Sequence, residues 1–545
     1  MRLRRDSFRL LAPAFWLLAS LGLLGSCARR ESPAAEGLRT RTLLIGNQNE
    51  PATLDPQIAD AYTDDIILAA LFEGLTVLDE RTSHALPGVA ERWDVSPDGL
   101  TYTFHLRPDA RWSNGDSVTA GDFAFSFRRI LTPAFGANYS YMLWPIKNAE
   151  AFNKGVLPDF SAVGIEVPDD HTLRLHLERP TPYLPALATH NTWMPVHRAN
   201  LEKFGRIDDR ANPWSRPGNM VSNGAFTLTE WSPNARVVVS KNPHYWDAAG
   251  TWLNRVVFFP IENADAEERD FRAGQLHLTY DVPKSKIPVY RAESPSPLRV
   301  DPLFNLVYLN FNVTKPPFTD PRVRHALALA VDRDAISRDV LFGAYTSARS
   351  IVPPDCGGYV SRASVSTDYE QARHLLAAAG FPGGKNFPVV PIQVLNDEAQ
   401  PRMAETIQAA WQRELGIRIT IEPYEQKTWL QNQRTLAHTL GILAWTADFA
   451  DPVTFLDLFR SGNGNNWTGW GDPAYDALLD QAARTADPHA RFEIFQKAEA
   501  YILQAAPVAP LFYHTRTYLM KPYVKGWPPS PIGLHRFQLV HFASP

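Results

Sequence analysis

Asp448 is the side chain whose surroundings best suit ligand-binding chemistry. The stretch from Leu440 to Ala447 that precedes it is mostly apolar, so its carboxylate would be partly desolvated. In that setting the carboxylate could form a charge-assisted hydrogen bond with an ammonium group, roughly twice as strong as a neutral bond. Alternatively, Asp448 only caps the turn that continues to Asp451 and Pro452. The residues alone leave both interpretations open.

The motifs of secreted hydrolases are missing from the sequence. It contains neither a Gly-x-Ser-x-Gly elbow nor a His-Glu-x-x-His helix. His171 and His176 are five residues apart on a predicted strand, so they face opposite sides and cannot share a metal there. The segment 380–385 is similar to a phosphate loop, but it is one residue short and no Ser or Thr follows its lysine. We therefore expect no enzyme activity, no cofactor and no metal site.

The N-terminus is typical of an exported bacterial lipoprotein. Three arginines among the first five residues precede an apolar run, Leu10 to Leu24, that is too short to span a bilayer comfortably. The run ends in Leu-Gly-Ser-Cys27, which is similar to the cleavage box after which the cysteine is lipidated. We predict a signal peptide over 1–26, lipidation of Cys27 and a flexible tether over 27–40. An ordinary signal peptide that ends near a cysteine is the alternative.

Composition points to a large globular protein. A chain of 545 residues is too long for one core, so two or three domains are expected, and 45% hydrophobic residues exclude a disordered chain. A net charge of −4 from scattered charges argues against nucleic acid as a partner. If Cys27 carries lipid, Cys356 has no disulfide partner, so stability must come from packed cores.

Strand and helix patterns alternate along the chain. Period-two alternation predicts strands at 100–106 and 171–177, and Thr119 to Asp122 indicates the start of a helix. Further strands are expected at 41–46, 237–240, 255–259 and 417–421, and helices at 321–331, 369–379 and 403–415. Such mixing favours α/β lobes.

Five sequence blocks occur together in the order found in a known protein family. They are 49–56 with 71–75; 87–93 with 98–107, 112–116 and 118–123; 222–226 with 241–247; 310–318 with 320–327 and 331–333; and 444–448 with 451–452. Together they resemble the extracellular solute-binding proteins of family five, above all the oligopeptide-binding lipoproteins of peptide ABC importers. The resemblance covers nearly the whole mature chain.

The resemblance implies an α/β, two-lobed, periplasmic-binding-protein-like (type II) fold with a hinge and an additional N-terminal-side domain. The domain boundaries follow from the same likeness. Lobe I would comprise 41–62, 187–280 and 515–545, the additional domain 63–186, and lobe II 281–514.

The resemblance also implies a function. The protein would enclose short peptides between its lobes, as an added strand held mainly by backbone hydrogen bonds, and deliver them to inner-membrane ABC permease subunits. We expect a monomer in the bacterial cell envelope, anchored by lipid to the bilayer at its periplasmic or other extracytoplasmic face, with no nucleic acid partner. The alternatives are a non-peptide solute (a nickel chelate, haem, a murein peptide or a sugar) and a peptide-sensing lipoprotein.

A set of ligand contacts follows from the resemblance. The set is Asp448 for the ligand ammonium, Trp445 for the cleft wall, Tyr139 (or Tyr141) for the ligand N-terminus, Glu50 and Asn223 for the ligand backbone, and Lys315 for a ligand carboxylate. Trp445 could equally be a core residue, and the last three could be surface or turn residues. Family members that hold tripeptides closely have an arginine three positions before the cleft tryptophan, where this chain has Ile442. The preferred ligand length therefore stays open.

Overall fold

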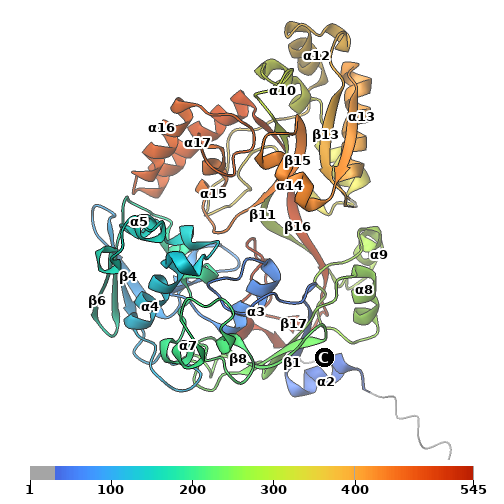
Figure 1. The fold of residues 1–545 in the computed structure, drawn as a ribbon. Coiled ribbons are helices and arrows are strands. Elements are labelled where there is room, and N and C mark those ends of the chain that lie inside the picture. The colour runs from blue at the N-terminus through green and yellow to red at the C-terminus, as the bar shows by residue number, and fades with distance from the viewer. Residues whose placement is uncertain (1–30, 398, 544–545) are drawn as a thin grey trace, which may run out of the picture.

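The computed structural model describes residues 31–397 and 399–543. The chain forms two lobes with an additional domain beside the lower one, and helices pack around three main β-sheets (Figure 1). This confirms the expected mixed α/β class. The predicted signal peptide and Cys27 lie outside the described residues. Among the residues that are described, no helix is both long and apolar enough to cross a membrane.

Lobe I is built on a four-stranded sheet in the order β1-β10-β9-β8. The strands are β1 (Thr42–Gly46), β8 (Phe226–Ser232), β9 (Arg236–Lys241) and β10 (Arg255–Phe259), and β1 runs parallel to β10 while the other pairs are antiparallel. Lobe I also contains the helices α7 (Arg198–Phe204), α8 (Ala264–Arg272) and α9 (Ile287–Ala292). The short strands β17 (Val524–Lys525) and β18 (His541–Phe542) bring the C-terminus back to this lobe (Figure 1).

Part of the predicted tether is folded. Helix α2 (Pro33–Thr40) begins at Ser32, whose hydroxyl accepts a hydrogen bond from the backbone N–H of Ala35. The Ala34 N–H donates to the carbonyl of Gly274 at 2.9 Å, and the Ala34 carbonyl lies 2.9 Å from Nε2 of His277. The prediction of a flexible tether over 27–40 is therefore wrong for residues 33–40. These residues dock on lobe I through backbone groups, which the sequence pattern does not show.

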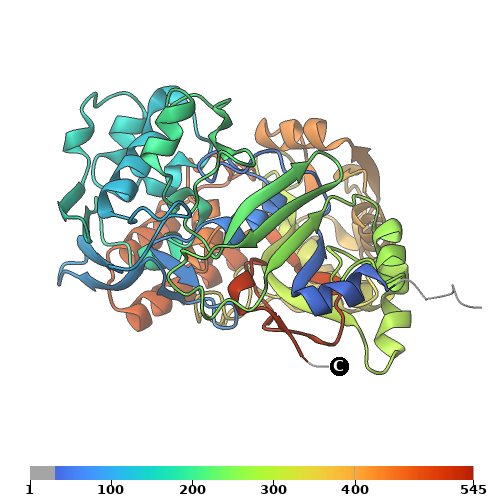
Figure 2. The ribbon, with the colours of Figure 1, turned by 90° about the horizontal axis from the view of Figure 1, so that it is seen from below.

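The additional domain lies to one side of the lobe I sheet (Figure 2). Its antiparallel sheet has the order β4-β5-β7-β6 and contains β4 (Ala90–Val95), β5 (Thr101–Leu106), β6 (Ile165–Asp169) and β7 (Thr172–His176); β2 (Thr76–Leu78) and β3 (Ala85–Pro87) form a separate hairpin. The remaining elements of this region are α3 (Tyr62–Leu71), α4 (Ala120–Leu131), α5 (Ala149–Asn153) and α6 (Leu184–Leu187). Helix α4 begins with the expected cap, because Thr119 and Asp122 bond reciprocally to each other's backbone N–H.

Lobe II contains a six-stranded sheet in the order β12-β16-β11-β15-β13-β14. Its strands are β11 (Leu298–Phe311), β12 (Tyr345–Ser347), β13 (Val390–Leu395), β14 (Ile419–Tyr424), β15 (Leu440–Thr446) and β16 (Val508–Leu519). Its helices are α10 (Pro321–Leu329), α11 (Arg333–Ala335), α12 (Tyr369–Ala378), α13 (Gln400–Leu415), α14 (Gln426–Arg434), α15 (Val453–Leu456), α16 (Pro473–Ala483) and α17 (Pro488–Ala505).

The lobe II sheet is covered on both faces. Successive residues of β11 show this division: Leu309 packs in the core formed with α10, α12 and α13, whereas Tyr308 packs in the core formed with α15, α16 and α17. A strand with two buried faces reads as a nearly continuous apolar run, as β15 does in the sequence.

The long strands β11 and β16 join the two lobes. Their antiparallel pairing begins beside lobe I, where Leu298 faces Leu519, and continues into the lobe II sheet, where Asn310 faces Val508 (Figure 1). A bulge interrupts the pairing between Pro302 and Leu306. Bulges bend strands and redirect side chains, so this one places irregular backbone at the junction of the lobes.

The domain boundary expected at 281 differs from the packing. Val282, Ile287 and Tyr290 are buried together with Leu44 of β1 and Val257 of β10. The segment before β11 therefore packs on lobe I, and the lobe II sheet begins only at Leu298.

Candidate ligand site between the lobes

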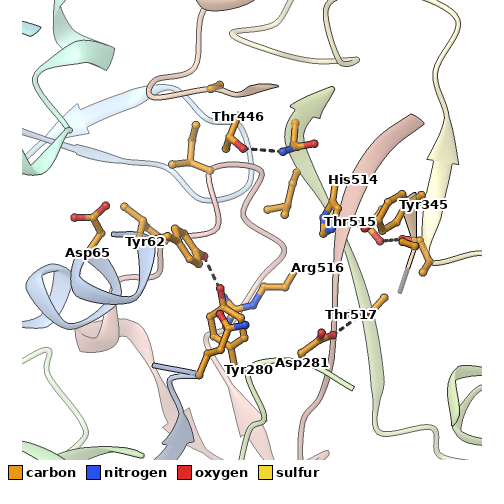
Figure 3. A pocket seen from close by; sticks show the side chains of 18 of the residues that line it. Tyr62, Asp65, Tyr280, Asp281, Tyr345, Thr446, His514, Thr515, Arg516 and Thr517 are labelled. Carbon is orange, nitrogen blue, oxygen red and sulfur yellow. Dashed lines mark hydrogen bonds between the residues drawn. The ribbon is translucent and has the colours of Figure 1, made fainter. Parts of the chain in front are cut away.

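A cavity of about 750 Å³ lies where the lobes, the additional domain and the joining strands meet. Tyr62 and Tyr280 line it from lobe I, Asp65 from the additional domain and Thr446 from lobe II (Figure 3). Asp448 of lobe II lines it as well. The strand β16 contributes a run of four consecutive residues from His514 to Thr517. A volume of this size is typical of pockets that bind small molecules.

Asp448 lies in the cavity wall, directly after β15. Burial raises the pKa of its carboxyl group to about 7. Within the described residues the carboxylate has no hydrogen-bond partner. The capping role that was its alternative belongs to Asp451, which accepts from the N–H of Val453 and forms an ion pair with Arg491 at 2.6 Å. Asp448 is thus placed where its carboxylate could bind a cationic group of a ligand.

A second acid, Asp65, shares the cavity with Asp448. Its Oδ1 atom is buried and has no hydrogen-bond partner among the described residues. Burial, followed by the charges of Asp64, Asp448 and Asp60, raises its pKa well above the usual range. The sequence analysis missed Asp65 because an acidic residue in the first turn of a helix is an ordinary feature.

Tyr139 is held in the cavity wall by aromatic neighbours. Its ring stacks on His190 at 5.5 Å and on Tyr141 at 5.6 Å between centroids. Burial, with the charges of Asp448 and Asp65 adding to it, raises the pKa of Tyr139 to about 12, so its hydroxyl stays protonated. Of the two tyrosines that the sequence analysis weighed, Tyr139 lines the cavity and Tyr141 is largely exposed.

The other four expected contacts, Glu50, Asn223, Lys315 and Trp445, lie outside the cavity lining. Glu50 accepts from Nε1 of Trp231 at 2.5 Å and from the N–H of Asn234. Asn223 is buried, and its side-chain amide bonds to both backbone groups of Glu73. Lys315 donates to the carbonyls of Ala437 and His438 at 2.7 and 2.9 Å. The hydrogen bonds of these three side chains are thus made within the protein: Glu50 within lobe I, Lys315 within lobe II, and Asn223 from lobe I to the additional domain.

Trp445 packs against the lobe II core rather than facing the cavity. It stands opposite Leu306 in the sheet, and its neighbours Thr446 and Ala447 line the cavity instead. Its indole Nε1 is buried without a hydrogen-bond partner among the described residues. Ile442, three positions before Trp445, is fully buried in the core on the α10 side of the sheet.

Arg516 is the principal cation that the sequence analysis did not identify. It lies on β16 inside the cavity lining, between the rings of Tyr280 and Tyr518, each 5.2 Å away (Figure 3). Burial alone would lower the pKa of Arg516, but the neighbouring tyrosines and Asp301 favour the charged form, so the net direction is upward. No local motif surrounds Arg516 in the sequence, which explains why it was overlooked.

The described residues contain no group of three or more acidic, histidine or cysteine side chains that could hold a metal ion. The cavity lining supplies carboxylates, the guanidinium groups of Arg402 and Arg516, the ammonium group of Lys284 and aromatic rings.

Comparison with known proteins identifies the family. Residues 84–467 match the family model described as bacterial extracellular solute-binding proteins, family 5 Middle. The chain belongs to this family. It is 33% identical over 521 residues to the periplasmic oligopeptide-binding protein OppA of Salmonella typhimurium, with 94% of each chain covered. It is 35% identical over 491 residues to the probable deoxycholate-binding periplasmic protein YgiS of Escherichia coli, covering 88% of this chain and 90% of that protein.

Solved structures support the same assignment. The unliganded open form of the periplasmic murein tripeptide-binding protein MppA matches with a TM-score of 0.81 and 31% identity, covering 92% of this family 5 chain and 97% of that one. The resemblance stated from the five sequence blocks is thereby confirmed, and so is the expected two-lobed binding-protein fold.

Proposed function

We propose that this family 5 protein captures short peptides between its lobes and delivers them to an ABC permease in the membrane. The observation that carries the proposal is Asp448, a partly buried carboxylate without a partner among the described residues, in a cavity lined by both lobes. A peptide ammonium would supply the missing partner. Lobe closure follows if the ligand interacts better with the closed state than with the open one.

The backbone next to Asp448 can also accept a peptide. Strand β13 pairs with β15 only at Leu440 and Gly441, whereas β11 pairs with the other edge of β15 as far as Thr446. The edge of residues 444–446 that faces away from β11 thus has no partner among the described strands. An extended peptide can add to such an edge through main-chain hydrogen bonds, which are largely independent of its side chains.

The experiment is a calorimetric titration of wild type and Asp448→Ala with matched free-amine and N-acetylated tripeptides. We expect the variant to lose about tenfold to a hundredfold in affinity for the free-amine peptides and little for the acetylated ones, because a charged hydrogen bond contributes about 1.5–3 kcal/mol. Asp109→Asn is the matched control, because Asp109 is exposed and lies outside the cavity lining. Equal losses for both peptide types would contradict the role of Asp448.

A non-peptide solute is the second candidate. Leu303, Leu341, Phe342 and Ile532 give the cavity an extensive apolar wall. Together with the similarity to a probable deoxycholate-binding protein, this wall favours an amphipathic acid as the alternative ligand. Titration with deoxycholate under the same conditions separates the two, since we expect the peptides to bind more tightly.

The proposal includes membrane attachment through a lipid on Cys27 and action as a monomer. The leader arginines, the apolar run and the Leu-Gly-Ser-Cys box support the anchor. A peptide-sensing role without a transporter would use the same site. Peptide uptake by cells that contain or lack this protein distinguishes delivery from sensing.

A further inference from the structure

Arg516 places a positive charge deep inside the cavity. Only 8% of this residue is exposed, and it lines the cavity from the strand that joins the lobes. In Figure 3 it lies at the centre of the view, beside Tyr62 and Tyr280. A buried guanidinium is costly unless its donors and its charge are compensated.

The compensation of Arg516 within the described residues is incomplete. Its Nη1 donates to Oη of Tyr62 and to the carbonyl of Gly533, both at 3.3 Å. Its Nε is buried and has no hydrogen-bond partner among those residues. No described carboxylate forms an ion pair with the Arg516 guanidinium. The nearby Asp301 accepts a hydrogen bond from the hydroxyl of Tyr518.

Other buried arginines of the chain show what full compensation looks like. Arg129 pairs with Asp55 at 2.6 Å, and its Nε donates to the carbonyl of Ile207. Arg324, which has no carboxylate partner of this kind, instead donates all its guanidinium nitrogens to backbone carbonyls. Arg516 has neither arrangement, although it too is buried.

Lys284, another cation in the cavity wall, is already engaged. Its Nζ donates to Asp281 and to Oγ1 of Thr517, both at 3.1 Å. An anionic ligand group would therefore find open donor capacity at Arg516 and a neutralised pair at Lys284. Ile442, three positions before Trp445, offers no guanidinium and is buried in the lobe II core.

We propose that Arg516 binds a carboxylate of the ligand, so that the cavity recognises molecules with an ammonium at one part and a carboxylate at another. This inference rests on the proposed function and narrows its ligand class to zwitterions. The carboxylate is either the C-terminus of a short peptide or an acidic side chain. Arg516 is suited to it, because a planar guanidinium matches a carboxylate with two parallel hydrogen bonds.

The test uses two ligand pairs that differ only in the carboxylate. The first pair is trialanine and trialanine amide; the second is Ala-Glu-Ala amide and Ala-Gln-Ala amide. In wild type we expect the acid of at least one pair to bind about tenfold to a hundredfold more tightly than its neutral partner. In Arg516→Gln that preference should vanish, while the neutral ligand keeps its affinity within about threefold. The pair that responds identifies which carboxylate is held.

Two variants control for structural damage. Arg516→Lys keeps the charge but not the planar fork, so we expect it to retain part of the preference for the acid. Arg299→Gln removes one charge from an exposed position on β11 outside the cavity lining, and should leave the preference unchanged. The melting temperature of each ligand-free variant is measured alongside.

Two results would overturn the proposal: no acid preference in wild type for either pair, or an equal loss for acid and neutral ligands in Arg516→Gln. Failure of the proposed function gives a different result, namely that no free-amine peptide binds wild type at all. In that event deoxycholate and its methyl ester replace the peptides. The same comparison then supports Arg516 if the acid is preferred only when Arg516 is present, and contradicts it otherwise.

Discussion

Asp65 on α3 of the additional domain and Asp448 after β15 of lobe II present their carboxyl groups to one cavity. Burial raises the pKa of both groups, and the charge of Asp448 contributes to the rise at Asp65. Bringing the lobes together without a cation would bring these two like charges closer in a medium of low dielectric constant. A ligand ammonium between them would remove that obstacle and would thereby couple ligand binding to closure of the lobes.

Peptide affinity should fall below pH 7. In the empty protein, burial raises the pKa of Asp448 to about 7, and a bound ammonium lowers it again because it favours the ionised form. Binding must therefore expel a proton at lower pH, which weakens affinity by about tenfold per pH unit until the pKa of the bound form is reached. Calorimetry between pH 5 and 8 measures this trend and the proton release.

N-acetylated peptides are the control for this pH series, and their affinity should vary much less. Affinity for free-amine peptides that stays constant from pH 5 to 8 would contradict the assignment. Above pH 8 the peptide amine itself loses its proton, so the optimum should lie between pH 7 and 8.

Asp65→Asn should stabilise the ligand-free protein at neutral pH. The pKa of Asp65 is raised on folding, so its cost to stability is absent below pH 4 and grows as the pH rises towards the folded-state pKa. We expect a gain of about 1–3 kcal/mol at pH 7 and little change at pH 4. Thermal unfolding at the two pH values measures the difference.

Asp55→Asn is the matched control for Asp65→Asn. Asp55 is also buried, but it forms an ion pair with Arg129 at 2.6 Å. Its loss leaves a buried charge without a counterion and should cost about 3–5 kcal/mol. If both variants lost stability at pH 7, the interpretation of Asp65 as an uncompensated acid would be wrong.

Deleting helix α2 should destabilise lobe I. A mature chain that starts at residue 41 loses the hydrogen bonds that Ala34 makes with Gly274 and His277, and it exposes the surface that α2 covers. We expect the melting temperature to fall by about 2–4 °C or more. A chain that starts at Glu31 keeps the helix and serves as the control; equal melting temperatures would show that α2 contributes nothing to stability.

Replacement of Cys27 by alanine should release the protein from the membrane. Without the thiol no lipid can be attached, and the described residues contain no helix that could span a bilayer in its place. Fractionation of cell envelopes, with immunodetection of the protein, measures the distribution. Cys356→Ala is the control, because that thiol is buried in lobe II. Retention of the Cys27→Ala protein in membranes would refute the lipid anchor.

Local signals in the sequence located much of the fold. The cap at Thr119, the alternation in β5 and β7, and the glycine after α13 depend on neighbours in the chain, so they could be recognised without the structure. Asp448 stood out for a similar reason, because a long apolar strand precedes it.

Long-range contacts explain what the sequence could not show. Glu50 bonds to Trp231 and Asn223 bonds to Glu73, partners that lie 181 and 150 residues away along the chain. Likewise, Arg516 donates a hydrogen bond to the hydroxyl of Tyr62, which is 454 residues away along the chain. The family resemblance predicted that Glu50 and Asn223 contact the ligand backbone. Whether such a polar side chain faces a ligand or another part of the protein depends on the packed fold.

The bulge between Pro302 and Leu306 has a mechanical consequence. Proline donates no backbone hydrogen bond, and the interrupted pairing leaves few cross-links between β11 and β16 at this level. A rotation centred there would change the angle between the halves of the molecule while the ladders above and below stay intact. Leu303, Asn305 and Thr515, which lie at this interruption, also line the cavity. A ligand in the cavity would therefore contact the segment about which the lobes would rotate, and could hold the angle between them.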